Sequence, residues 1–223
     1  MAEENDKIEI NPSGPSRGSV IWLHGLGASG DDFVPVAREL NTLGFNLRFI
    51  FPHAPMQPVT INGGYVMRAW YDIVSLSIDS HADTSGMEKT EQTIHALIQA
   101  EEKNGTPTEK IILAGFSQGA VMALLTGLRY PKKLAGILAL SGYLPHPNET
   151  IANAPKKNHA TPIFIGHGTA DTIVPCILGK TVFDALQHAQ YSVEWHDYLM
   201  PHSVCMEEVA DIAQWMGKIY SEE

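Results

Sequence analysis

Short runs of apolar residues, many of them β-branched, recur along the chain with longer amphipathic segments between them. The clearest runs are residues 19–23, 47–51, 111–116, 136–140, 162–165 and 192–198, with a weaker one at residues 7–10. Runs that are apolar along their whole length are typical of parallel strands buried on both faces. The alternation therefore predicts an α/β fold, with a mostly parallel central sheet, helices on both faces and residues 7–10 at an edge.

The segments between these runs have helical spacing. Residues 91–102 and 209–216 carry their apolar side chains on one stripe, as surface helices do. Residues 118–129 are apolar nearly all round and stop before Pro131, which cannot continue a helix. That pattern predicts a buried helix in the middle of the fold.

Two connections are longer than ordinary loops. Residues 52–71 contain several prolines and the pair Gly63 and Gly64, and residues 141–161 are also rich in proline. Long loops of this kind often form lids or pocket walls. Inert surface is the alternative, and the sequence leaves both open.

Composition sets the limits of the molecule. With 223 residues, of which 44% are hydrophobic and 18% charged, the chain fits one globular domain over residues 1–223. Its formal net charge of −10 opposes binding to a phosphate backbone or an anionic membrane. Nucleic acid is therefore not an expected partner.

The first residues and the two cysteines indicate in which compartment the protein is expected. The first residues, MAEENDKIEI, are acidic where a secretory signal would be basic and then apolar, and no run is long enough to cross a bilayer. We therefore expect a cytoplasmic protein without a stable membrane anchor. Cys176 and Cys205 match no zinc spacing and are too few for a disulfide framework, so thiols and no metal site are expected.

The sharpest chemical signal is a G-x-S-x-G motif centred on Ser117. It directly follows the apolar run at 111–116 and directly precedes the predicted buried helix. A serine between glycines is also common in plain turns. Between a strand and a helix, however, the motif forms a tight turn that presents the hydroxyl group above the sheet, as in α/β-hydrolases.

A serine nucleophile needs a base and an acid, which follow it in the order serine, acid, histidine. Asp171 comes in a turn just after the predicted strand 162–165, whereas Asp184 and Asp211 fall on helices and Asp197 on a strand. A helix cap or turn residue is the alternative for Asp171. We expect Asp171 to be the acid.

Of the histidines after Asp171, only His202 lies in a loop between a strand and a helix. His188 falls on a helix, and His196 falls within the run at 192–198. A loop histidine by itself is usually idle, so this assignment depends on Ser117 and Asp171. His202 is the expected base.

The oxyanion of a tetrahedral intermediate needs backbone donors. In this fold they are the amide after the nucleophile and one in the loop after an early strand. These are Gln118 and Leu26, the latter in the glycine-rich loop WLHGLGASGDD. A phosphate-binding loop is the alternative, but the string has neither the dinucleotide nor the Walker pattern.

Together these motifs resemble the phospholipase/carboxylesterase family, which includes the acyl-protein thioesterases. The resemblance covers nearly the whole chain and is carried by HGLG at 24–27, PHAP at 52–55, AWYD at 69–72, GFSQG at 115–119, LSGYLP at 140–145, HGTADTIVP at 167–175 and HSVC at 202–205. Two positions depart from it: Ala28, where many relatives carry an acidic residue, and Pro201, where glycine is frequent. They bear on substrate preference and loop shape.

The resemblance implies the same triad and oxyanion residues and adds an acyl groove. Its walls would be Leu26, Trp70, Ile73, Leu76, Tyr143 and Val174, for which ordinary core packing is the alternative. It implies a small-molecule or lipid acyl ester as substrate, or an acylated protein, without a cofactor. A homodimer remains open.

The leading hypothesis is a serine carboxylesterase acting on acyl esters, thioesters or lysophospholipids through an acyl-enzyme on Ser117. The rival from another class is a catalytically silent acyl-binding module on the same fold. A peptidase or acyltransferase would need an acceptor site that the sequence does not reveal. If Asp171 and His202 are partners, Cys176 and Cys205 should also lie near each other, as two thiols.

Overall fold

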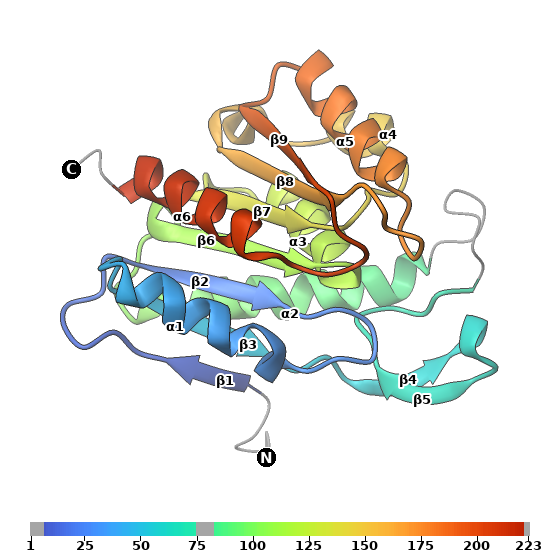
Figure 1. Cartoon of the computed structure of the whole chain (residues 1–223), viewed down its shortest axis with the longest axis horizontal. Coiled ribbons are helices and arrows are strands. Elements are labelled where there is room, and N and C mark those ends of the chain that lie inside the picture. The colour runs from blue at the N-terminus through green and yellow to red at the C-terminus, as the bar shows by residue number, and fades with distance from the viewer. Residues whose placement is uncertain (1–6, 75–82, 221–223) are drawn as a thin grey trace.

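A twisted seven-stranded sheet forms the centre of the computed structural model, which describes residues 7–74 and 83–220 (Figure 1). The strand order is β1 (Lys7–Ile10), β3 (Leu47–Pro52), β2 (Gly18–Leu23), β6 (Ile111–Phe116), β7 (Gly136–Leu140), β8 (Ile163–Gly168) and β9 (Val193–Tyr198). Only β1 runs antiparallel to its neighbour; the other pairs are parallel. The predicted α/β class and the edge position of residues 7–10 are confirmed.

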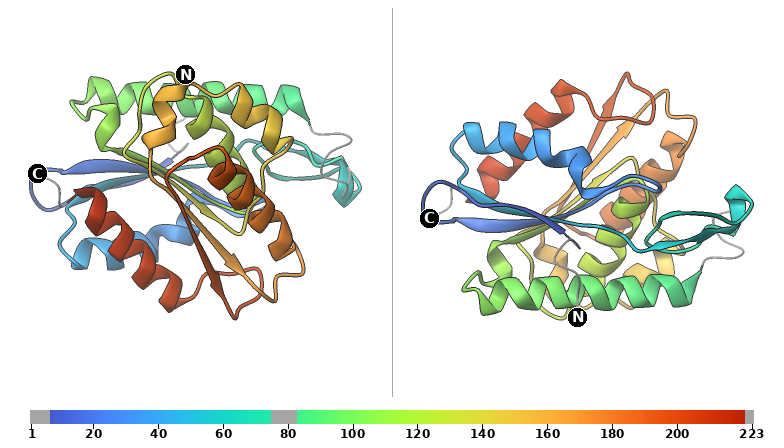
Figure 2. Two further views of the ribbon diagram at one scale, coloured as in Figure 1. Left: turned by 90° about the horizontal axis from the view of Figure 1, so that it is seen from above. Right: turned by 90° about the horizontal axis from the view of Figure 1, so that it is seen from below.

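Helices cover both faces of this sheet (Figure 2). They are α1 (Val34–Thr42), α2 (Thr84–Lys103), α3 (Gln118–Arg129), α4 (Pro147–Ala152), α5 (Cys176–His188) and α6 (Met206–Tyr220). Side chains of α1 and α6 pack in one core layer, and those of α2, α3 and α5 pack in the other.

Strand β6 shows why its sequence is apolar throughout. Ile111 and Leu113 belong to the core layer under α2 and α3, whereas Ile112 and Ala114 belong to the layer under α1 and α6. Successive side chains of a strand point to opposite faces, so a central strand needs apolar residues at every position. Helix α3 has the predicted bounds, and nearly all of it is buried.

The predicted helix at 91–102 is the second half of α2, which begins earlier. The side chain of Asp83 caps it by accepting a hydrogen bond from the Gly86 amide. The first turns carry few apolar residues, so hydrophobic spacing alone places the start too late.

The two long connections contain regular structure. The stretch at 52–71 forms an antiparallel hairpin of β4 (Met56–Val59) and β5 (Tyr65–Arg68), joined by the short 3-10 helix η2 (Thr60–Asn62). It projects from the end of the molecule where β2 and β6 finish (Figure 1). The stretch at 141–161 holds α4 and the 3-10 helix η4 (Lys156–Ala160).

Two further 3-10 helices lie in connections: η1 (Gly30–Phe33) precedes α1, and η3 (Thr108–Lys110) precedes β6. Among the helices that the structure describes, none has both the length and the apolar character that crossing a bilayer requires.

Candidate active site

Ser117, Asp171 and His202 each follow the carboxyl end of a strand. Ser117 directly follows β6, Asp171 lies in the turn after β8, and His202 lies in the loop after β9. Because these strands are parallel, their carboxyl ends share one edge of the sheet, where binding sites of α/β folds form.

Ser117 occupies a strained turn. Its backbone has φ 55° and ψ −119°, a conformation that non-glycine residues rarely adopt, and its amide donates to Leu140 O at 2.9 Å. A Cβ atom at Gly115 would lie 2.2 Å from Gly119 O, and one at Gly119 would lie 2.2 Å from Leu23 O. The glycines of the motif are therefore needed for close backbone packing around the serine.

A continuous chain of hydrogen bonds joins the three side chains. His202 Nε2 lies 2.9 Å from Ser117 Oγ, and His202 Nδ1 lies 2.6 Å from Asp171 Oδ2. The Asp171 side chain is fully buried, whereas the His202 side chain keeps 17% of its surface exposed. The imidazole thus lies between a buried carboxylate and a half-buried hydroxyl group.

The turn after β8 orients Asp171. Its Oδ1 accepts hydrogen bonds from the amides of Ile173 and Val174, both at 2.9 Å, which leaves Oδ2 for His202. The same turn is joined to the His202 loop, since Ala170 N donates to Met200 O at 3.1 Å. Two loops far apart in sequence are therefore fixed to each other beside the imidazole.

The alternative acids and bases lie elsewhere, as the sequence predicts. Asp184 is on α5 and pairs with Lys180 at 2.8 Å, while His188 ends that helix. His196 is on β9, where its ring stacks on Phe164 at a centroid distance of 4.3 Å.

Of the two expected oxyanion donors, Gln118 directly follows Ser117 and Leu26 lies in the turn after β2. Gln118 is the first residue of α3, where a helical amide has no partner in the preceding turn. Leu26 lies in the half-exposed turn after β2, where the neighbouring Gly27 amide donates to Arg68 O at 2.8 Å. The hairpin thus anchors the turn that carries Leu26.

His24 supports this turn, a role that the sequence did not reveal. It is buried; its Nδ1 lies 2.7 Å from Gly25 O, and its Nε2 accepts from Ala54 N at 3.0 Å. Burial lowers the pKa of His24, so the ring is neutral. Because Nε2 accepts the Ala54 amide, the proton lies on Nδ1, which donates to Gly25 O. The HGLG string contains this histidine, but its partner Ala54 is distant in sequence.

Gln118 also binds Trp70, a residue that the family resemblance assigns to the groove, and its neighbour Tyr71. Its side chain accepts from Trp70 N and donates to Tyr71 O, both at 2.8 Å. The Trp70 indole donates to His24 O at 2.8 Å, and Trp70 is only 2% exposed.

The other proposed groove residues are spread around the same end of the sheet. Ile73 and Tyr143 are half-buried against the core, and Tyr143 Oη lies 3.3 Å from the hydroxyl group of Tyr71. Val174 is half-buried in the Asp171 turn. Leu76 lies outside the described residues.

Both cysteines are half-buried free thiols. Cys176 begins α5 and Cys205 directly precedes α6, and these helices cover opposite faces of the sheet. Burial raises the pKa of the Cys176 thiol, and the Asp197 and Asp171 carboxylates add to the shift. Whether the two thiols approach each other stays a prediction.

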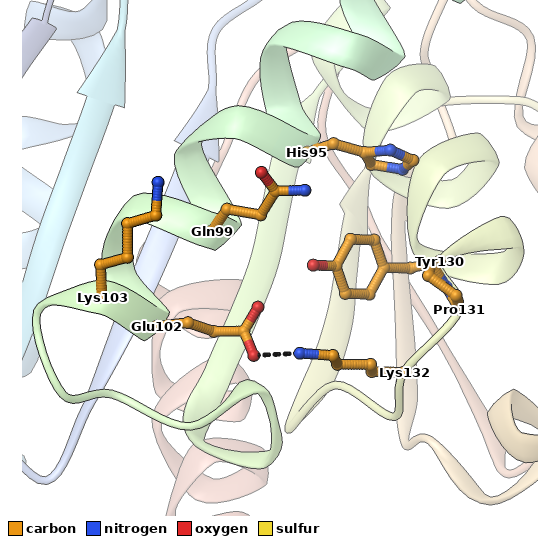
Figure 3. Close-up of a pocket in the computed structure, with 7 residues that line it drawn as sticks. All are labelled: His95, Gln99, Glu102, Lys103, Tyr130, Pro131 and Lys132. Atoms are coloured by element: carbon orange, nitrogen blue, oxygen red, sulfur yellow. Dashed lines mark hydrogen bonds and ion pairs between the residues drawn. The ribbon is translucent and has the colours of Figure 1, made fainter.

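A separate hollow of about 480 Å³ lies between the ends of α2 and α3 (Figure 3). It is lined by His95, Gln99, Glu102, Lys103, Tyr130, Pro131 and Lys132. Helix α3 runs for 12 residues from Ser117 toward this hollow, a separation of about 18 Å. The hollow is therefore not part of the candidate active site.

The mostly parallel sheet, with helices on both faces and a strained serine turn between β6 and α3, defines the class of fold, that of the α/β-hydrolases. Residues 5–220 match the Phospholipase/Carboxylesterase family. The chain belongs to this family.

Relatives cover nearly the full length. The acyl-protein thioesterase 1 of Cryptococcus neoformans is 35% identical, over 94% of this chain and 95% of that protein. The crystal structure of Arabidopsis thaliana SOBER1 matches with a TM-score of 0.84 at 34% identity, over 91% of this chain and 98% of that chain. Zea mays acyl-protein thioesterase 2 matches with a TM-score of 0.82 at 29% identity, over 96% and 98%.

Proposed function

We propose that this protein is a serine carboxylesterase that hydrolyses acyl esters, with thioesters and lysophospholipids in the same substrate class. The observation that carries the proposal is the hydrogen-bonded chain from Ser117 through His202 to Asp171. Membership of a family that includes proteins named carboxylesterase and acyl-protein thioesterase supports this class of reaction.

In the proposed mechanism, His202 Nε2 takes the proton of the Ser117 hydroxyl group as Oγ attacks the acyl carbon. Asp171 holds the imidazole by Nδ1 and stabilises the cation that forms. The imidazolium then gives its proton to the leaving alcohol or thiol, and an acyl-enzyme remains. Water, activated by His202, releases the acid and restores the serine.

The amides of Leu26 and Gln118 are the proposed donors to the oxyanion of both tetrahedral intermediates. The start of α3 adds the partial positive charge of a helix N-terminus at the same point. Such donors act most strongly once charge has developed, so they lower the barrier more than they tighten substrate binding.

The finer parts of the proposal go beyond the geometry of the site. An acylated protein is a candidate substrate because relatives are named acyl-protein thioesterases. The acyl groove formed by Leu26, Trp70, Ile73, Leu76, Tyr143 and Val174, a homodimer and a cytoplasmic location are also proposals. Assays with esters of graded acyl length, a thioester and a lysophospholipid would define the substrate range.

The test of the reaction type is labelling with a fluorophosphonate probe. We expect wild-type protein to be labelled on Ser117, and Ser117→Ala to lose both labelling and hydrolysis, with kcat falling by about 10⁴ or more. The exposed Ser13→Ala is the matched control and should keep full activity.

Persistent turnover by Ser117→Ala would refute the proposed nucleophile. Wild-type protein that binds acyl esters without turnover or labelling would instead identify a silent acyl-binding module.

A further inference from the structure

His167 is a buried polar side chain to which the proposed mechanism gives no role. It lies near the end of β8, four positions before Asp171, and none of its surface is exposed. Its Nε2 lies 2.8 Å from Val174 O, so this nitrogen carries the proton and donates. The same nitrogen is 3.5 Å from Asp171 Oδ2, the oxygen that also binds His202.

The second ring nitrogen, Nδ1, is buried without a hydrogen-bond partner among the described residues. Helix α5 approaches it so closely that a Cβ atom at Gly179 would lie 2.4 Å away. The Trp195 ring stacks on the imidazole at a centroid distance of 6.2 Å. An unpaired buried nitrogen reduces stability, so a hydrophobic side chain would suit this position better if it served packing alone.

His167 instead closes the turn that orients the acid. Val174 donates its amide to Asp171 Oδ1 and accepts from His167 through its carbonyl group. The His167 imidazole therefore fixes Val174, whose amide in turn fixes the Asp171 carboxylate. Rotation of Asp171 would require this turn to move against a fully buried ring.

We propose that His167 is a positioning residue that fixes Asp171 through Val174 and thereby sets the orientation of His202. This inference rests on the proposed function, because His167 can act on the reaction only through Asp171. It touches neither Ser117 nor a reacting atom, so it is not a catalytic residue.

The groups that face His167 determine how pH acts on it. Asp171 and His202 approach from the two loops, Asp197 is the exposed register partner on β9, and α5 presents the uncharged Gly179. Burial lowers the pKa of His167, opposed by the Val174 carbonyl group and the Asp171 carboxylate. The ring therefore stays a neutral donor where His202 acts as a base.

The test compares two variants. His167→Phe keeps an aromatic ring but loses the N–H donor, whereas His167→Gln has a side-chain amide that can donate to Val174 O again. For His167→Phe we expect kcat to fall about 10- to 100-fold with KM nearly unchanged, because a displaced acid misorients the base. His167→Gln should recover most of this loss. Circular dichroism and thermal melting establish that each variant is folded.

The pH profile gives a readout that a purely structural role would not move. An Asp171 carboxylate that no longer faces the His202 imidazole stabilises the imidazolium cation less. The acid limb of the kcat/KM profile should therefore shift to lower pH in His167→Phe. If that variant fails to fold, Gly179→Ala offers a second route, because its Cβ atom displaces the His167 ring without removing the donor. The same shift is expected there.

The possible failures are distinguishable. Turnover by Ser117→Ala refutes the proposed function whatever the His167 variants do. An inactive Ser117→Ala together with folded His167→Phe that keeps wild-type kcat and acid limb refutes only the positioning role. Equal losses in the Phe and Gln variants also refute it, since the donor would then be irrelevant.

Discussion

Glu208 places a carboxyl group in the core at the first turn of α6. The residue is fully buried, and neither carboxyl oxygen has a hydrogen-bond partner among the described residues. A Cβ atom at Gly166 would lie 2.2 Å from Glu208 Oε1, so the glycine makes room for this group. Burial raises the pKa of Glu208 to about 8, with a further contribution from the Asp211 carboxylate.

This shift predicts a pH-dependent loss of stability. The unfolded chain releases the proton of Glu208 near pH 4.5, whereas the folded chain retains it up to about pH 8. Between these values the unfolded state binds fewer protons than the folded state, so the free energy of unfolding falls as pH rises. Proton linkage gives a total decrease of about a few kcal/mol. Glu208→Gln should remove this dependence.

Thermal melting between about pH 5 and pH 8 measures the effect. We expect the Tm of Glu208→Gln to rise relative to wild type as pH increases. Glu207→Gln, at the exposed neighbouring position, is the control and should follow wild type. Parallel curves for wild type and Glu208→Gln would contradict the prediction.

At the scale of elements, the β4–β5 hairpin acts as a brace for the turn after β2. Gly27 N donates to Arg68 O at 2.8 Å, and Arg68 Nη1 donates to Ala54 O at 2.9 Å. Ala54 in turn donates its amide to His24. The orientation of the Leu26 amide thus depends on a hairpin that comes later in the chain.

Gly27→Ala tests this dependence. Gly27 has φ +72°, and a Cβ atom there meets only Met67 Sδ at 3.6 Å, so the substitution acts through the backbone and not through a clash. We expect kcat to fall about 10- to 100-fold with a smaller effect on KM, less than the loss of a whole oxyanion donor would cause. Steady-state kinetics with a short acyl ester provide the measurement.

Gly63→Ala is the matched control. Gly63 has φ +66° and no atom near its Cβ position, so it carries the same backbone penalty in a turn of the hairpin away from Leu26. It should reduce stability without lowering kcat. A change in KM alone for Gly27→Ala would mean that the turn shapes binding and does not serve the oxyanion.

At the scale of the whole molecule, a network of ion pairs around Arg48 lies at the edge of the sheet opposite the candidate active site. At the amino edge, the buried Glu101 of α2 accepts from Ser19 Oγ at 2.6 Å and pairs with Arg48 Nε at 3.2 Å. Arg48 also pairs with Glu9 at 2.8 Å. This network joins α2 to β1, β2 and β3.

Arg48→Met should therefore reduce stability without affecting catalysis. It leaves the Glu101 carboxylate buried and without its cation, which destabilises by up to about 3 kcal/mol. Urea denaturation measures the loss, and kcat at 25 °C should stay at the wild-type value because Ser117 lies at the other edge. Lys132→Met, which breaks the exposed pair with Glu102, is the control and should change little. Equal losses in the two variants would contradict the prediction.

The sequence by itself determined the class of fold and predicted the three side chains, Ser117, Asp171 and His202, that the structure brings within hydrogen-bond distance. Apolar runs located the inner strands of the central sheet, because a strand buried on both faces must be apolar at each position. The edge strands β1 and β9, also predicted, carry charged residues among the apolar ones because they are partly exposed. The G-x-S-x-G motif located Ser117, because only glycine tolerates the backbone contacts that this turn requires. Both signals are local, so they are readable from neighbouring residues.

Only the tertiary structure decided how distant segments meet. His202 lies 31 positions from Asp171 and 85 positions from Ser117, and their hydrogen bonds exist because parallel strands end at one edge. The same holds for His167 and Glu208, whose sequence context does not show that packing buries them.

The β4–β5 hairpin escaped prediction because its strands are short and largely exposed, and such strands need no hydrophobic pattern. The spacing of apolar residues predicts which face of a helix or strand is buried. Contacts between loops depend instead on the order of the strands in the sheet, and no local sequence pattern specifies that order.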